Sequence, residues 1–246
     1  MEKKVVLITG GTRGIGFAAA KRFGKEGYIV AVNGINMDNG ALAEKELRNL
    51  GYEAFYFKAD VTKEIEVDAM MEDVIKKLGR LDVLVNNAGG LVGRKPIDGM
   101  ETSHWNAVMD LNLNSAFYVS RAAIPHLKKN GGSIINVTSI AAQMGGGPGA
   151  AAYAVTKAGL VTFTRGLAKE LIPFGIRVNA ISPGTIDTDF HSSTSRELMD
   201  SWVKGIPAGR LGKPEDIANA IYFAASEEAA FLVGEVIQVN GGQDFR

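Results

Sequence analysis

Apolar runs of strand length alternate with segments of helical period along the whole chain. The predicted strands cover residues 5–9, 28–33, 53–57, 81–86, 132–138, 175–181 and 234–239. The predicted helices lie near residues 14–26, 40–50, 64–78, 104–129, 150–172 and 214–225. This alternation is typical of a parallel sheet whose consecutive strands are connected by helices.

The predicted strands are apolar on both faces. Residues 5–9 read VVLIT and residues 81–86 read LDVLVN, as expected of strands that are covered by helices on both sides. Right-handed crossovers then give an α/β fold with one doubly wound sheet. No linker, charge run or internal repeat divides the chain, so we expect a single domain over residues 1–246. The polar, serine-rich stretch at about 185–210 contains a short predicted helix, and we expect a substrate lid there.

The composition excludes several classes of function. The chain has 246 residues with 27 basic and 27 acidic side chains, so we expect no basic surface for nucleic acid or an anionic membrane. It has no cysteine and only three histidines, which lie far apart in the sequence, so we expect no disulfide and no metal site. Neither a signal-peptide segment nor an apolar run of about 18 residues occurs, which predicts a cytoplasmic protein.

A glycine-rich loop follows the first predicted strand. Residues 9–16 read TGGTRGIG and lie between that strand and a predicted helix. Glycines allow a sharp turn and a close approach of a pyrophosphate to the helix N-terminus. The spacing G-x-x-x-G-x-G differs from the usual dinucleotide-binding loop, so an ordinary tight turn is the alternative interpretation.

The end of the second predicted strand bears on the choice of cofactor. In NAD sites an acid about 20 residues after the glycine loop binds the ribose hydroxyls. Residues 32–36 read VNGIN and carry no carboxylate, while Arg13 in the glycine loop is a candidate partner for a 2′-phosphate. The sequence therefore favours NADPH, with NADH still possible, although Arg13 could also be a solvated loop arginine.

Further motifs follow the later strands in a recognisable order. They are Asp60-Val61, Asn86-Asn87-Ala88-Gly89, Asn112, Ser139, Tyr153-x-x-x-Lys157 and Pro183-Gly184. Together with the glycine loop they resemble the short-chain dehydrogenase/reductase family over essentially the whole chain. The resemblance implies a Rossmann-like sheet of seven strands, hydride transfer with NAD(P)(H), and a homodimer or homotetramer.

Tyr153 and Lys157 lie four residues apart on a predicted helix, so their side chains share a face. A carbonyl that accepts a hydride must also gain a proton, and a phenol with a pKa of about 10 serves near neutrality only if a cation stabilises its phenolate. Lys157 would supply that charge. The resemblance implies that Lys157 also holds the nicotinamide ribose, that Ser139 orients the substrate oxygen, and that Asn112 helps to keep a water chain. A capping serine and a helix-kink residue are the structural alternatives for Ser139 and Asn112.

The resemblance also implies which residues bind the cofactor. Asp60 and Val61 would contact the adenine ring, and Thr188 would bind the nicotinamide carboxamide, a role that Thr185 could share. The full predicted set is Gly10, Thr12, Arg13, Gly14, Ile15, Gly16, Asn33, Gly34, Asp60, Val61, Asn87, Ala88, Gly89, Tyr153, Lys157, Pro183, Gly184, Ile186 and Thr188.

These residues predict an NADPH-dependent oxidoreductase that reduces a ketone or aldehyde to an alcohol. The residues 145–149, which read GGGPG, suggest a widened loop over the substrate, and the stretch 185–210 offers few large apolar side chains. Arg94 and Lys95 follow the fourth strand and could pair with a substrate carboxylate, unless both are merely solvated. We therefore expect a small polar keto acid or keto sugar as the substrate.

Other functions remain as alternatives. A 3-oxoacyl-carrier-protein or CoA reductase is one, but such relatives carry basic residues where this chain has Asn130 and Phe174. A non-catalytic nucleotide-binding sensor is a second, although it would need no phenol and amine on one helix face. A Ser-His-Asp hydrolase is disfavoured because the chain has no G-x-S-x-G elbow.

Overall fold

Seven parallel strands form one sheet in the computed structural model, which describes residues 2–188 and 196–245. The order is β3-β2-β1-β4-β5-β6-β7, and every neighbouring pair is parallel. The strands are β1 (Val5–Ile8), β2 (Ile29–Gly34), β3 (Ala54–Lys58), β4 (Val83–Asn86), β5 (Gly132–Val137), β6 (Ile176–Pro183) and β7 (Val236–Val239). The prediction of a doubly wound, seven-stranded α/β fold is confirmed.

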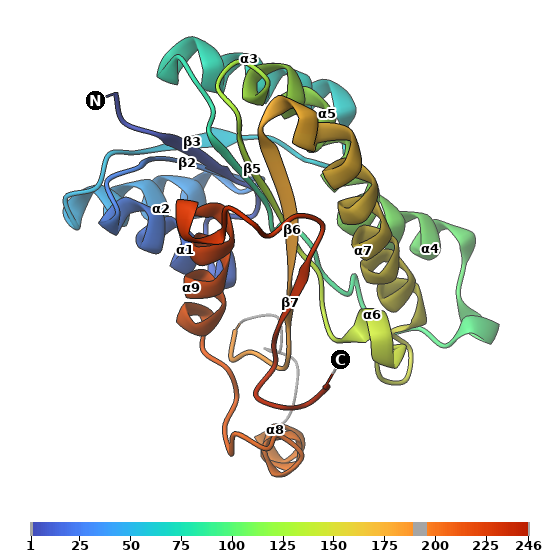
Figure 1. Cartoon of the computed structure of the whole chain (residues 1–246). Coiled ribbons are helices and arrows are strands. Elements are labelled where there is room, and N and C mark those ends of the chain that lie inside the picture. The colour runs from blue at the N-terminus through green and yellow to red at the C-terminus, as the bar shows by residue number, and fades with distance from the viewer. Residues whose placement is uncertain (1, 189–195, 246) are drawn as a thin grey trace.

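Helices cover both faces of the sheet (Figure 1). One face carries α1 (Gly14–Lys25), α2 (Met37–Asn49) and α9 (Pro214–Ala225). The other carries α3 (Glu64–Leu78), α5 (Ser115–Leu127) and α7 (Ala151–Leu171), with α4 (Thr102–Met109) beside α7. The short helices α6 (Ala141–Met144) and α8 (Arg196–Lys204) lie beyond the carboxyl ends of the strands.

The alternation of side chains along β1 explains its uninterrupted apolar sequence. Val5 and Leu7 belong to the core under α3, α5 and α7, whereas Val6 and Ile8 belong to the core under α1 and α9. All four side chains are fully buried. A strand that is covered on both faces must be apolar at every position, as the sequence pattern indicated.

The helix predicted over 104–129 is present, but it contains a π-helical turn that the sequence pattern did not predict. The segment is divided into α4, a π-helical turn at Asp110–Asn114, and α5. Within that turn the side chain of Asn112 bonds to the backbone of a neighbouring loop: its Nδ2 donates to the Gly90 carbonyl at 2.8 Å, and its Oδ1 accepts from the Gly90 N–H at 2.9 Å. A bulge of this kind inserts one extra residue into the helix and turns Asn112 toward that loop.

The strand order reverses between β1 and β4, which are neighbours in the sheet although two strands separate them in the chain. In open α/β sheets, ligands bind in the crevice outside the carboxyl ends of the strands at such a reversal.

Among residues 2–188 and 196–245, no helix combines the length and the apolar character needed to cross a membrane.

Candidate active site

The glycine loop presents an uncapped helix N-terminus. Arg13 is the residue before α1 and adopts an extended conformation, and its side chain makes no capping hydrogen bond to the first turn. Gly10 and Gly14 have φ values of 59° and 54°, a region that other residues enter only with strain. The free N–H groups of the first turn and the positive end of the helix dipole therefore suit a pyrophosphate.

The segment after β4 braces this loop. Asn87 Nδ2 donates to the carbonyl oxygens of Thr9 and Gly10, at 2.9 and 3.0 Å. A Cβ atom on Gly16 would lie 2.3 Å from the Gly10 oxygen and 2.5 Å from Asn87 Nδ2. Gly16 therefore serves the close packing of α1 against the loop, whereas Gly10 and Gly14 line the cavity.

A cavity of about 870 Å³ opens at the carboxyl ends of the strands. It is large enough for a dinucleotide and a small substrate, since ligand pockets usually measure about 300–1,000 Å³. It brings together most of the residues that the sequence predicted. Those that line it are Gly10, Thr12, Arg13, Gly14, Ile15, Asn33, Gly34, Asp60, Val61, Asn87, Ala88, Gly89, Ser139, Tyr153, Lys157, Pro183, Gly184, Ile186 and Thr188.

Two of the predicted catalytic and cofactor-binding residues do not line the cavity. Gly16 is buried under the glycine loop, as described above. Asn112 is fully buried, and its amide holds Gly90 while it also donates to the Val108 carbonyl at 3.0 Å. A Cβ atom on Gly89 would lie 2.7 Å from Asn112 Oδ1, so Asn112 contacts the cavity wall from behind.

The far end of the cavity combines polar and apolar groups from β2 and β3. Arg13, Gly34 and Ile35 line it together, and the side chain of Ile35 is largely exposed. Asp60 lies beside them, where its Oδ1 accepts hydrogen bonds from the N–H and the hydroxyl of Thr62, at 3.0 and 2.7 Å. No acidic side chain occupies the end of β2, the position from which a carboxylate would repel a 2′-phosphate.

Ser139, Tyr153 and Lys157 converge where β5 and α7 meet. Lys157 is buried, and its Nζ donates to the carbonyl of Val137 at 2.8 Å. Ser139 accepts a hydrogen bond from the Ala141 N–H at 3.1 Å, so it also caps the short helix α6. Both interpretations of Ser139, as a capping residue and as a residue of the cavity, are therefore compatible.

Burial shifts the pKa values of the phenol and the amine in opposite directions, because it favours the neutral form of each group. Loss of solvent raises the pKa of Tyr153 to about 12, an effect that a hydrogen bond with Ser139 partly offsets. Loss of solvent lowers the pKa of Lys157 to about 8. At neutral pH the cavity therefore contains a protonated phenol, which can donate a proton, next to a lysine that is still mainly cationic.

The other end of the cavity is closed by two loops that contact each other. Arg94 Nη1 donates to the Pro148 carbonyl at 3.1 Å, and the Lys95 N–H donates to the Gly149 carbonyl at 3.0 Å. The loop is strained at Val92, a β-branched residue with a φ of 58°. This arrangement holds the Arg94 guanidinium at the cavity wall.

The two bases that the sequence predicted for a substrate carboxylate have different surroundings. Arg94 lines the cavity, whereas Lys95 does not and forms an ion pair with Glu101. The position of Arg94 is compatible with the predicted contact to a substrate carboxylate, whereas the ion pair of Lys95 outside the cavity favours the alternative that this lysine is solvated. Asp189, His191 and the hydroxyl residues at 192–195 lie outside the described residues.

Several residues of the cavity were not predicted from the sequence. Leu91 and Met144 reach it from the loop after β4 and from α6, and Gln243 reaches it from the turn after β7. No local signal marks Gln243, since its partner Thr185 is 58 positions away in the sequence. Among the described residues, no three His, Asp or Glu side chains form a group that could hold a metal ion.

Comparison with known proteins shows extensive similarity. A family model described as enoyl-(acyl carrier protein) reductase matches residues 10–244. The chain is 40% identical over 241 residues to a 3-oxoacyl-[acyl-carrier-protein] reductase of Chlamydia muridarum, covering 97% of this chain and 96% of the relative. The corresponding reductase of Staphylococcus aureus is also 40% identical, with 97% of each chain covered.

Solved structures share the same fold. A putative gluconate dehydrogenase from Agrobacterium tumefaciens is 33% identical, with a TM-score of 0.93 over 98% of this chain and 95% of its own. A second structure, of a protein called gox2181, is 30% identical with a TM-score of 0.95, over 99% of this chain and 96% of its own.

Proposed function

The chain belongs to the short-chain dehydrogenase/reductase family of NAD(P)-dependent carbonyl reductases, and we propose that it uses NADPH to reduce a small polar keto acid or keto sugar. The observation that carries this proposal is one cavity that joins an uncapped helix N-terminus, a buried Tyr153–Lys157 pair and the Arg94 guanidinium. Each of these three parts suits a different part of the reaction.

Tyr153 is the proposed proton donor. When bound, the nicotinamide cofactor supplies the hydride. The Tyr153 hydroxyl then gives its proton to the carbonyl oxygen, and Ser139 orients that oxygen. Lys157 stabilises the phenolate left on Tyr153 and binds the nicotinamide ribose. Its hydrogen bond to the Val137 carbonyl supports this role, because it fixes the ammonium group relative to β5.

Preference for NADPH rests on the charges at the far end of the cavity. Arg13 stands at the start of α1, and the end of β2 offers Gly34 and Ile35 in place of a carboxylate. A guanidinium binds a phosphate through charge-assisted hydrogen bonds. These residues support a site for the 2′-phosphate.

Arg94 supports an anionic substrate. Among the described residues, the charged side chains of the cavity are Arg13, Asp60, Arg94 and Lys157. The first two lie at the proposed adenosine end and Lys157 belongs to the catalytic pair, which leaves Arg94 to face a substrate. Arg94 uses one N–H group of its guanidinium to bond to the Pro148 carbonyl. A carboxylate on the substrate would pair with the N–H groups that remain.

The chain is further proposed to act as one domain with a lid and to form a homotetramer or homodimer. Ser201 and Trp202 of α8 line the cavity, which supports a lid in the stretch 185–210. Phe117 and Val155 are exposed apolar residues on α5 and α7, and exposed apolar side chains on adjacent helices support contacts between subunits. Sedimentation at micromolar concentration tests this; a mass near the 26.2 kDa of the monomer would contradict it.

Reduction of a 3-oxoacyl thioester is the second candidate. The curated relatives at 40% identity carry that activity in their names. Besides Trp202 of the stretch 185–210, the cavity also contains apolar side chains from outside that stretch, among them Leu91 and Met144. Relatives of that class have a basic residue where this chain has Phe174. The Lys128 ammonium lies over the Phe174 ring, 3.8 Å from its centre, so a basic group is present close to that position.

A substrate panel separates the two candidates. The rates of NADPH and NADH oxidation are measured with keto acids, keto sugars and acetoacetyl thioesters at matched concentrations. The proposal expects the highest kcat/KM with NADPH and a keto acid or keto sugar. Higher kcat/KM for acetoacetyl thioesters than for every sugar-derived ketone would establish the second candidate, and binding of NADPH without turnover of any carbonyl would favour a sensor.

A further inference from the structure

Gln243 connects the C-terminal turn to the loop that follows β6. Its Oε1 accepts a hydrogen bond from the Thr185 N–H at 2.7 Å, and its Nε2 donates to the Thr185 hydroxyl at 3.1 Å. Both residues line the cavity that contains Tyr153. One side-chain amide thus holds the backbone and the side chain of a single cavity residue.

The direction of both hydrogen bonds follows from the chemistry of the backbone. A backbone N–H can only donate, so the amide atom that faces it must be the carbonyl oxygen of Gln243. The other amide atom is then the NH₂ group, which can only donate, so the Thr185 oxygen accepts. The Thr185 hydroxyl accepts this bond through a lone pair, so its own proton is not used in the contact with Gln243. The hydroxyl can therefore donate that proton to another group.

The turn that carries Gln243 is held firmly against the end of β6. Gly184 N–H donates to the Val239 carbonyl at 3.0 Å, and a Cβ atom on Gly184 would lie 2.7 Å from the Asn240 Cα. Asn240 closes the turn, because its Nδ2 donates to the Asp244 carbonyl at 2.8 Å and its Oδ1 accepts from the Gly242 N–H at 2.9 Å. This close approach makes Gln243 a preorganised partner of Thr185.

The loop that Gln243 holds also reaches the glycine loop. Thr188, three residues after Thr185, has its Cγ2 3.6 Å from the position that a Cβ on Gly14 would take. The segment 185–188 therefore lies along the wall of the cavity that contains Tyr153 and Lys157 and extends to the start of α1. A nicotinamide whose reactive carbon faces Tyr153 would lie against this segment, and the oxygen of its carboxamide requires a donor.

We propose that Gln243 is a positioning residue that makes the Thr185 hydroxyl a hydrogen-bond donor to the nicotinamide carboxamide. This inference rests on the cofactor of the proposed function and is independent of the identity of the substrate. Gln243 acts through Thr185, and removing the donor affects binding of the nicotinamide half of the cofactor, whereas the adenosine half binds at the other end of the cavity.

Gln243→Glu tests the direction of the hydrogen bond with little change in shape. Either carboxylate oxygen still accepts from the Thr185 N–H, but the other now accepts the hydroxyl proton and turns it away from the cavity. We expect Kd for NADPH, measured by fluorescence, to rise about tenfold, the usual cost of one lost hydrogen bond in a desolvated site. Kd for 2′-phospho-ADP-ribose, which lacks nicotinamide, should change less than about twofold.

Variants of Thr185 provide the matched comparison. Thr185→Val removes the hydroxyl at constant shape and should weaken NADPH binding as Gln243→Glu does, whereas Thr185→Ser should preserve it. The double variant Gln243→Glu/Thr185→Val should bind NADPH no more weakly than Thr185→Val alone, because both changes remove the same donor.

Several outcomes would overturn the proposal. One is unchanged NADPH binding in Gln243→Glu, and another is an equal loss of affinity for NADPH and 2′-phospho-ADP-ribose, which would indicate a merely structural turn. If Gln243→Glu does not fold, as judged by its thermal unfolding, equal binding by Thr185→Val and Thr185→Ser decides against the proposal. Absence of NADPH binding in the unmodified protein would instead contradict the proposed function itself.

Discussion

The Lys157 ammonium nitrogen lies 5.6 Å from the centre of the Tyr153 ring, one turn further along α7. The hydrogen bond from this ammonium to the Val137 carbonyl fixes the position of Lys157 relative to the end of β5. Burial opposes ionisation of both groups, and proximity of the cation favours the phenolate. In the proposed mechanism, the separation of the two side chains would therefore set how strongly Lys157 stabilises the phenolate of Tyr153.

Tyr153→Phe should abolish turnover, by about 10²–10⁴-fold in kcat, because it removes only the proton donor. Kd for NADPH should remain close to that of the unmodified protein. Tyr118→Phe is the matched control, since Tyr118 packs with Phe117 on α5 and does not line the cavity. Steady-state kinetics and NADPH fluorescence check both; a Tyr153→Phe enzyme that keeps more than a few per cent of the rate would refute the role.

Stability should depend on pH through Lys157. Its pKa is about 8 in the folded protein, below the value of 10.5 for an exposed lysine, so the folded state binds fewer protons than the unfolded state between those two pH values. The free energy of unfolding contributed by this group therefore increases as the pH rises from about 8 to 10.5.

Urea unfolding of the unmodified protein and of Lys157→Met at pH 7 and 9.5 measures this dependence. Between the two pH values the unmodified protein should gain on the order of 1–2 kcal/mol relative to the variant. A difference that stays constant with pH would show that the amine is not shifted. The same variant should also lower kcat and weaken NADPH binding, because it removes the cation.

Arg13→Ala should raise KM for NADPH about tenfold and leave KM for NADH nearly unchanged, because it removes a partner of the 2′-phosphate only. NADH is thus the internal control. Comparison of kcat/KM for the two cofactors checks the expectation. Equal or better use of NADH by the unmodified protein would contradict the proposed preference.

Gly34→Asp should reverse or erase the preference for NADPH by placing a carboxylate where the 2′-phosphate would bind. A Cβ atom at this position would lie 2.8 Å from Thr12 Cγ2, so the change is best made together with Thr12→Ser, which removes that methyl group. Thr12→Ser alone is the matched control and should retain the preference. An unchanged cofactor ratio in the double variant would place the 2′-phosphate elsewhere.

Arg94→Ala should raise KM for keto acids about tenfold or more with a smaller effect on kcat, because the guanidinium binds the substrate carboxylate away from the reacting carbonyl. Lys95→Ala is the control from the same loop, since Glu101 binds that lysine outside the cavity. The ratio of KM for a keto acid to KM for an uncharged ketone isolates the charge. If neither variant changes this ratio, the anionic substrate is excluded.

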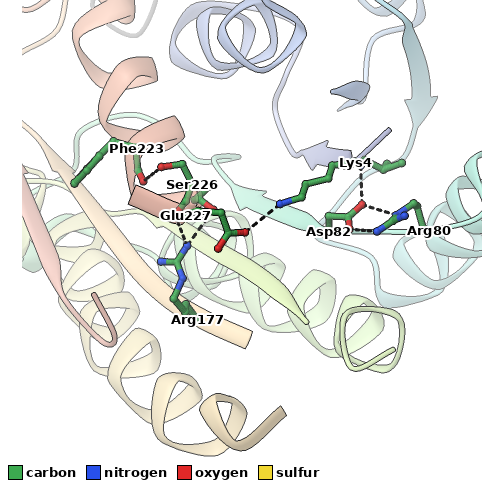
Figure 2. Close-up of polar contacts among 9 residues, drawn as sticks. Lys4, Arg80, Asp82, Arg177, Phe223, Ser226 and Glu227 are labelled. Atoms are coloured by element: carbon green, nitrogen blue, oxygen red, sulfur yellow. Dashed lines mark hydrogen bonds and ion pairs between the residues drawn. The ribbon is translucent and has the colours of Figure 1, made fainter. Parts of the chain in front are cut away.

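Arg177→Met should reduce the free energy of unfolding by about 2–4 kcal/mol without changing kcat. The guanidinium donates to four carbonyl groups at and after the C-terminal end of α9, at 2.8 to 3.0 Å, and Figure 2 shows it beside Glu227. Burial lowers the pKa of Arg177, and these carbonyl groups satisfy its donors at the edge of the sheet opposite the cavity.

Lys4→Met is the matched control for this change. Lys4 pairs with Glu227 at 3.1 Å, but both side chains are exposed, so its loss should cost less than about 1 kcal/mol. Chemical denaturation measures both variants. Equal stability of Arg177→Met and the unmodified protein would show that the capped helix end needs no side-chain partner.

The sequence by itself determined most of the elements and the placement of Tyr153 and Lys157 on one helix face. Continuous apolar runs define strands buried on both faces, and the helices α3 and α9 begin and end where the pattern predicts. The spacing of Tyr153 and Lys157 implies a shared helix face, because helical period is a property of neighbouring residues. The roles of the predicted site residues stay predictions until the variants are measured.

The tertiary structure decided what depends on residues far apart in the sequence. Asn112 lies in a π-helical turn of a predicted helix and bonds to Gly90, and Lys95 pairs with Glu101 outside the cavity that Arg94 lines. Gln243 meets Thr185 only because β7 pairs with β6 and returns the chain to the cavity (Figure 1). Local pattern specifies which face of an element is apolar, but only packing specifies which distant polar group completes a hydrogen bond.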